Sequence, residues 1–123
     1  MKMKRAHRIP LSARALEILA AAMASADKSG LVFHSDAGKA LSDMTLSKLV
    51  KELGFKADVH GFRTSFRTWT QEATSFPREV AEAALAHATG DAVEAAYARS
   101  DLFEKRRIMM EAWAAYLAVP VTN

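Results

Sequence analysis

Residues 60–73 carry two opposite stripes of side chains at helical spacing, and no other feature of the sequence constrains the fold as strongly. One stripe is apolar and recurs at i, i+4, i+7 and i+11: Phe62, Phe66, Trp69 and Ala73. The other is cationic and recurs at i, i+3 and i+7: His60, Arg63 and Arg67. The pattern predicts a helix whose aromatic side joins a core. Its cationic side is either a solvated surface or a binding face for an anion.

The same spacing elsewhere predicts a mainly α-helical fold. Further helices are expected over about residues 12–25, 42–54, 77–87 and 93–97, and from residue 101 to about 117. Ser12, Ser42 and Asp101 are the expected N-caps, because their side-chain oxygens can accept from free backbone N–H groups. Glu104 stands at the reciprocal position of the last cap. The last helix is expected to bury one apolar face: Phe103, Met110, Trp113 and Leu117.

A short segment near the N-terminus breaks the helical pattern. Between residues 5 and 11, apolar and polar side chains alternate as they do in a strand. Pro10 has no N–H to donate, so this strand is expected at the edge of a sheet. The fold class predicted is therefore mainly α, with a small, incomplete β-element near the N-terminus.

Composition excludes several classes of protein. A length of 123 residues suits one domain, and half of the residues are hydrophobic, which predicts a packed chain rather than disorder. There is no cysteine, which excludes a disulfide scaffold and a zinc ribbon and fits a reducing compartment. No apolar run approaches a membrane span, and the first residues lack the apolar core of a signal peptide. A cytoplasmic protein with no membrane partner is expected.

The positive charge is concentrated at the start of the chain. The net charge is only +3, yet residues 1–14 hold five basic side chains and no acidic one: Lys2, Lys4, Arg5, Arg8 and Arg14. Such a segment points to an anionic partner, with nucleic acid as the leading candidate. A solvated terminus is the alternative.

Four residues between positions 60 and 97 suggest phosphodiester chemistry: His60, Arg63, His87 and Tyr97. Arginine can bind two phosphate oxygens, histidine can move a proton, and tyrosine can act as a nucleophile. Together they could cleave a phosphodiester with no metal and no cofactor. Taken singly, His87 could be a cation at a helix end and Tyr97 a half-buried packing residue.

These motifs give the chain a family resemblance. From Lys2 to about Leu117 it resembles the C-terminal catalytic domain of the tyrosine recombinases, particularly the phage and prophage integrases. The resemblance rests on four ordered segments: Met1-Lys-Met-Lys-Arg-Ala-His-Arg-Ile-Pro10-Leu, His60-Gly-Phe-Arg63 followed by Thr68-Trp69, Leu85-Ala-His87, and Ala96-Tyr97-Ala-Arg99 followed by Asp101. One H-x-x-R motif occurs often by chance, whereas several motifs in this order do not.

The resemblance implies a role for each matching residue. Tyr97 would attack the scissile phosphate and form a 3′-phosphotyrosyl bond to DNA. Arg63 would hold the nonbridging oxygens in the transition state, while His60 and His87 would hydrogen-bond to the phosphate. Lys2 would protonate the departing 5′ oxygen. The other basic residues expected to contact DNA are Lys4, Arg5, Arg8, Arg67 and Arg99.

The resemblance also implies that residues 1–123 are a partial catalytic domain. Family members have another essential arginine upstream of the matching hairpin and a DNA-binding region before it, and both are expected to be absent here. The implied function is integration or excision of a prophage or mobile element, with further recombinase protomers on double-stranded attachment sites. The fragment alone is expected to be inactive. The alternatives are a non-catalytic DNA-binding remnant and a helical protein with no nucleic-acid role.

Overall fold

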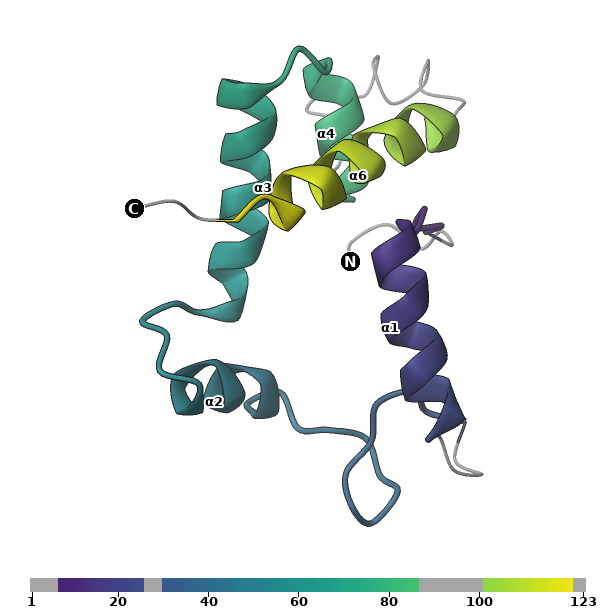
Figure 1. Cartoon of the computed structure of the whole chain (residues 1–123), viewed down its shortest axis with the longest axis vertical. Coiled ribbons are helices and arrows are strands. Elements are labelled where there is room, and N and C mark those ends of the chain that lie inside the picture. Colours follow the sequence, from purple (N-terminus) through teal and green to yellow (C-terminus); the bar gives the residue numbers. More distant parts are fainter. Residues whose placement is uncertain (1–6, 26–29, 87–100, 121–123) are drawn as a thin grey trace, which may run out of the picture. The chain divides into compact units, whose positions relative to one another are not determined.

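The computed structural model describes residues 7–25, 30–86 and 101–120, and these ranges are helical with irregular connections (Figure 1). The helices are α1 (Ala13–Ala24), α2 (Thr45–Glu52), α3 (Val59–Ala73), α4 (Arg78–Ala84) and α6 (Phe103–Ala118). No strand occurs in the described ranges, so the prediction of a mainly α fold is confirmed. None of these helices is both long enough and apolar enough to cross a membrane.

The strand expected over residues 5–11 is not found in the part of it that is described. Residues 7–12 are neither helix nor strand. The carbonyl oxygen of Arg8 accepts a hydrogen bond from the Arg106 side chain instead of from a neighbouring strand. Pro10 is buried and has no N–H to contribute to a ladder. The segment therefore docks through side-chain and packing contacts rather than through strand pairing.

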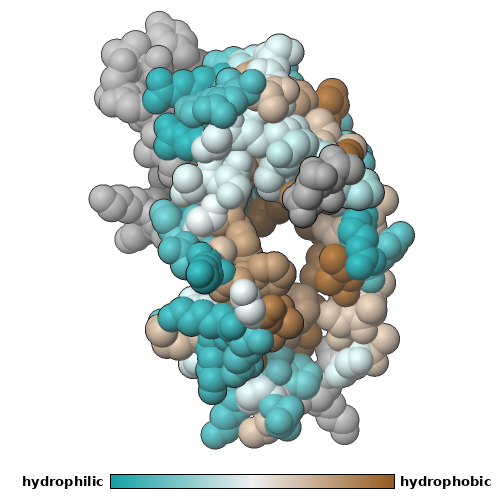
Figure 2. All heavy atoms as spheres, turned by 60° about the vertical axis from the view of Figure 1, so that its left-hand side comes forward, coloured by the Kyte–Doolittle hydropathy of each residue, from teal (hydrophilic) through white to brown (hydrophobic). Residues whose placement is uncertain are grey.

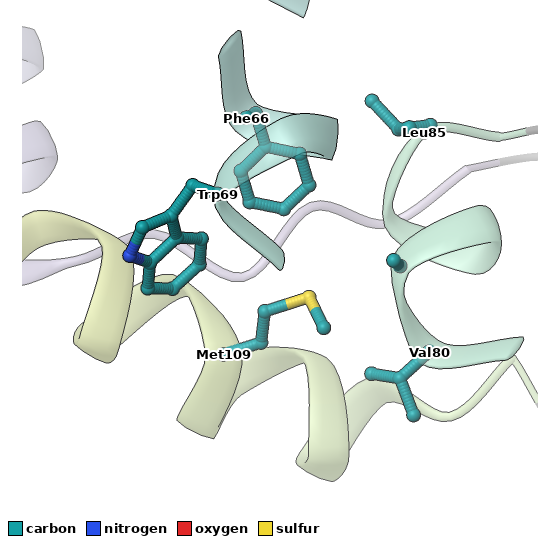
Figure 3. Packing of buried hydrophobic residues seen from close by; sticks show 6 residues of the cluster. Phe66, Trp69, Val80, Leu85 and Met109 are labelled. Carbon is teal, nitrogen blue, oxygen red and sulfur yellow. The ribbon is translucent and has the colours of Figure 1, made fainter. Parts of the chain in front are cut away.

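The chain divides into two compact units. One comprises Met1–Ser12 with Ser65–Asn123, and the other comprises Ala13–Thr64. The hydrophobic core lies in the first unit, where the C-terminal half of α3, α4 and α6 meet. Its buried members are Phe66, Trp69, Val80, Ala81, Leu85 and Met109 (Figure 3). Val80 and Met109 are completely buried, so they lie at its centre.

Aromatic side chains extend this core. The Trp69 ring lies 5.0 Å from the Trp113 ring, and Phe66 meets Trp113 edge-on at 5.3 Å. Contacts of this kind stabilise a core beyond the area they bury. The sequence prediction is thus confirmed for Phe66 and Trp69. It is wrong for the two ends of the stripe, because Phe62 and Ala73 are exposed.

The buried face of α6 also differs from the predicted one. Met109 and Arg106 are buried, whereas Leu117 is 61% exposed. Phe103, Met110 and Trp113 are only partly buried. Each residue turns an α-helix by about 100°, so exchanging Met110 for Met109 rotates the contact face substantially. The contact with α4 selects this rotation, and the seven residues of α4 are too few to cover α6 to its end.

The unit of residues 13–64 has no buried side chain among its described residues. Both of its complete helices lie within the predicted ranges, although α2 is shorter than predicted. Their apolar positions are largely exposed: Leu16, Ile18, Met23, Leu46 and Leu49. Apolar side chains are visible at the surface in the space-filling view, where they are brown (Figure 2). Helical periodicity therefore predicted these elements without predicting how deeply they are buried.

The helix starts are partly as predicted. α1 begins directly after Ser12, as expected. α2 begins later than expected, with Met44 at its N-cap, and the Ser42 hydroxyl lies 2.9 Å from the Thr45 hydroxyl instead of bonding to a backbone N–H. The expected cap of α6 acts one residue early: Leu102 is at the N-cap with φ of 57°, and the Asp101 carboxylate accepts the Phe103 N–H at 3.2 Å. Glu104 pairs with Arg107 rather than reaching back toward the cap.

Candidate functional site

Asp58 caps the helix that carries the first motif. Its carboxylate accepts the Gly61 N–H at 2.6 Å, directly before the start of α3 at Val59. This N-cap satisfies a backbone donor that the first turn would otherwise leave free. A side chain at Gly61 would place its Cβ 3.2 Å from the same carboxylate oxygen, so glycine leaves room for the cap. Sequence reasoning missed Asp58, although an aspartate directly before an apolar helical pattern is a recognised start signal.

His60 and Arg63 project from the turn that Asp58 caps. They are three residues apart on α3 and therefore lie on the same side of it. His60 is exposed and Arg63 is half-buried. An imidazole and a guanidinium on one side of a capped helix turn offer several N–H donors to a single anion such as a phosphate.

Arg67 continues this side of α3, but its charge has a partner within the fold. Its guanidinium forms an ion pair of 3.0 Å with Glu82 of α4, whose side chain is only 15% exposed. Ion pairs shielded from water are screened less than exposed ones, so this contact helps to fix α4 on the C-terminal half of α3. A DNA-binding role for Arg67 stays a prediction.

Removing the Asp58 cap should loosen the turn that carries His60 and Arg63. We expect Asp58→Ala to lower the free energy of unfolding by about 1 kcal/mol, the usual cost of losing an N-cap. Asp58→Ser keeps an oxygen acceptor at the cap and is the matched control, with an expected loss well below that of the alanine variant. Urea denaturation followed by circular dichroism measures both. Equal losses in the two variants would contradict the capping role.

Arg8, another predicted DNA contact, is also engaged internally. Its guanidinium forms a 2.9 Å ion pair with Asp101 and donates to both carboxylate oxygens. The same guanidinium lies 4.3 Å from the centre of the Phe103 ring, within cation–π range. Both charged side chains remain substantially exposed, at 64% and 44%. Contact of Arg8 with DNA stays a prediction, and it would compete with this pair.

The pair makes stability depend on pH in the acid range. Hydrogen bonds from Arg8 hold the pKa of the Asp101 carboxyl below its usual value of 3.8. A lowered folded-state pKa stabilises the fold above the unfolded value, and this contribution is lost as the pH falls through the folded pKa. We expect the free energy of unfolding to decline below about pH 4, with a shallower decline in Asp101→Asn. Urea denaturation at successive pH values tests this, and identical slopes in the two proteins would contradict it.

The second motif is described only in part. Leu85 is buried in the core, and Ala86 adopts a left-handed conformation with φ of 57° that ends the α4 segment. The remaining predicted site residues lie outside the described residues: Lys2, Lys4, Arg5, His87, Tyr97 and Arg99. The helix expected over residues 93–97 lies outside them as well. Of the predicted site, the structure brings together His60 and Arg63.

Comparison with protein families identifies the chain. The sequence model described as "Phage integrase family" matches residues 1–103, which is most of the chain. This chain belongs to the phage integrase family. The match includes the capped His60–Arg63 turn and the whole of α4, so the resemblance drawn from the motifs is confirmed.

Integrases of bacteria and phages are similar to this family member over nearly its whole length. Prophage integrase IntA of Escherichia coli (strain K12) is 37% identical over 93% of the chain, and the integrase of Enterobacteria phage P4 is 35% identical over 95%. The integrase of Shigella phage Sf6 is 32% identical over 95%. The chain spans only 28–31% of the length of these relatives. No solved structure matches it significantly.

Proposed function

We propose that the chain is the larger part of a catalytic domain that cuts and rejoins DNA at specific sites, through a 3′-phosphotyrosyl intermediate. The observation that carries this proposal is the first turn of α3, where His60 and Arg63 share one side and Asp58 caps the backbone. Membership of the phage integrase family supports it. The order of His60, Arg63, His87 and Tyr97 in the sequence, which resembles the order of the family's motifs, supports it as well.

In the proposed reaction, the hydroxyl oxygen of Tyr97 attacks the scissile phosphorus. The bond to the 5′ oxygen of the next nucleotide breaks, and Lys2 donates a proton to that oxygen. His60 accepts the tyrosine proton, while Arg63 and His87 donate hydrogen bonds to the nonbridging oxygens as negative charge accumulates there. The reverse sequence rejoins the strands, since the phosphotyrosyl bond retains the energy of the original phosphodiester. No metal or cofactor takes part in these steps.

The substrate of this reaction is double-stranded DNA carrying attachment sites, in the course of integration or excision of a prophage or mobile element. Recombination exchanges strands between two sites, so further recombinase protomers on the same DNA are part of the proposal. The cytoplasm, where such DNA is accessible, is the proposed compartment.

A non-catalytic DNA-binding remnant is the second candidate. The internal ion pairs of Arg8 and Arg67 do not separate the two candidates, because partners within the fold would weaken the DNA contacts of either one. Both candidates bind DNA, but only the first forms a covalent bond to it. Formation of a protein–DNA adduct therefore separates them.

The DNA-binding part of the proposal predicts a strong dependence on salt. Binding of the chain to duplex DNA should weaken steeply as salt rises, because each phosphate contact releases condensed counterions and adds about 0.9 to the slope of log K against log salt. Arg63→Gln should reduce that slope by about 1. The matched control is Arg107→Gln, an exposed α6 arginine outside the predicted interface, which should leave the slope unchanged. Fluorescence anisotropy measures both, and binding that is absent at low salt or indifferent to salt would reject the DNA-binding role.

A further inference from the structure

Arg106 is a buried charged residue that the proposed chemistry does not use. Its side chain is only 1% exposed, although it lies in the first turns of α6. One terminal nitrogen donates to the Arg8 carbonyl oxygen at 2.6 Å, and the other lies 3.4 Å from the Asp101 carbonyl oxygen. The first of these nitrogens is also 3.4 Å from the His7 ring. One guanidinium thus connects the N-terminal segment, the residues before α6 and α6 itself.

Burial of this charge calls for a reason. Removing a guanidinium from water is costly, and an apolar side chain of similar volume would commonly stabilise such a position equally well. Nε of Arg106 is buried and has no hydrogen-bond partner among the described residues. The surroundings of the guanidinium therefore do not satisfy all of its N–H donors. What the guanidinium provides, and an apolar side chain could not, is two directed bonds to the main chains of separate segments.

A second contact joins the same two segments at the surface. The Arg8 guanidinium holds the Asp101 carboxylate, and that carboxylate also accepts the Phe103 N–H. The segment beginning at His7 is therefore attached to the start of α6 twice, once through main-chain carbonyls that bond to the buried Arg106 side chain and once through an exposed side-chain pair. We call this set of four residues the junction: His7, Arg8, Asp101 and Arg106.

We propose that Arg106 is a positioning residue, which through the junction holds Arg8 and Asp101, the residues that lead to the two chain segments with candidate catalytic groups. This inference rests on the proposed function, because its consequence concerns Lys2 and Tyr97. Lys2 precedes Arg8 by six residues, and Tyr97 precedes Asp101 by four. The points from which both segments depart are fixed by one side chain, and a shift of about 1 Å in a reacting group can lower a rate by up to about 10²-fold.

The first experiment tests the junction in the chain itself. The chain has no cysteine, so Ile9→Cys and Glu111→Cys, both at exposed positions, can carry one spin label each without competing sites. Double electron–electron resonance should give a narrow distance distribution between the labels. Arg106→Met should broaden it, Asp101→Asn should broaden it less, and the matched control Arg107→Met should leave it unchanged. Circular dichroism verifies that each variant folds. If Arg106→Met does not fold, the distance distribution of Asp101→Asn, a substitution at an exposed position, is used to test the junction instead. A distribution that stays narrow in Arg106→Met, or in Asp101→Asn when that variant decides, would overturn the junction.

The second experiment separates positioning from binding. Residues 1–123 replace the matching portion of the phage P4 integrase, and adduct formation on nicked attachment-site DNA is measured at saturating protein. Arg106→Met should slow the adduct about 10- to 100-fold with the DNA dissociation constant changed less than twofold, and Arg106→Lys should restore part of the rate. An unchanged rate, or a loss explained entirely by weaker binding, would overturn the positioning role. An unaltered chimera that forms no Tyr97-dependent adduct overturns the proposed function and the positioning role with it, whereas the spin-label result on the junction still stands.

Discussion

Replacing Tyr97 with phenylalanine should abolish covalent attachment of the protein to DNA and leave DNA binding intact. The change removes only the phenolic oxygen, which is the proposed nucleophile, and retains the ring. A phenol with the usual pKa near 10 is mostly protonated at neutral pH, so its attack depends on cations and a proton acceptor nearby. His60 and Arg63, on the capped turn of α3, are the described groups that could supply them.

The measurement uses the chimera with the phage P4 integrase and a nicked duplex that traps the cleaved strand. Denaturing electrophoresis should show an adduct for the unaltered chimera and none for Tyr97→Phe. Tyr116→Phe is the matched control, because Tyr116 stacks on the Trp113 ring at 5.7 Å and so has a packing role. That variant should form the adduct normally. An adduct that survives Tyr97→Phe would assign the nucleophile elsewhere.

Truncation of Met109 should strongly destabilise the core. Met109 belongs to α6 and is completely buried where α6 meets α3 and α4 (Figure 3). We expect Met109→Ala to lower the free energy of unfolding by about 2–5 kcal/mol, through lost burial and the cavity left behind. Small domains are stable by only about 5–15 kcal/mol, so a large share of the stability would be lost. Urea denaturation measures the difference.

Ile108→Ala is the matched control for that prediction. Ile108 precedes Met109 on the same helix and is 62% exposed. Its truncation should change the free energy of unfolding by less than about 0.5 kcal/mol, as surface substitutions usually do. Met110→Ala should fall between the two, since Met110 is only partly buried. A larger loss of unfolding free energy in Met110→Ala than in Met109→Ala would contradict this prediction and would support the buried face of α6 that the sequence predicts.

The part of the candidate site that could be predicted is the part encoded locally. His60 and Arg63 share a side of α3 because three-residue spacing in any helix places them there. Asp58 could have been predicted too, since a cap bonds to the backbone only three residues away. The ion pair of Arg8 could not have been predicted, because its partner Asp101 is 93 residues distant and nothing in the local sequence marks it.

The sequence by itself determined that the chain is helical, the approximate positions of the described helices, and which family it belongs to. These properties depend on periodicity, capping residues and motif order, all of which operate over a few neighbouring residues. Only the tertiary structure decided that Met109 rather than Met110 enters the core, and that Arg106 is buried against a carbonyl 98 residues away. An apolar stripe wide enough to face a core permits several rotations of a helix, and the contact with its neighbours selects one of them.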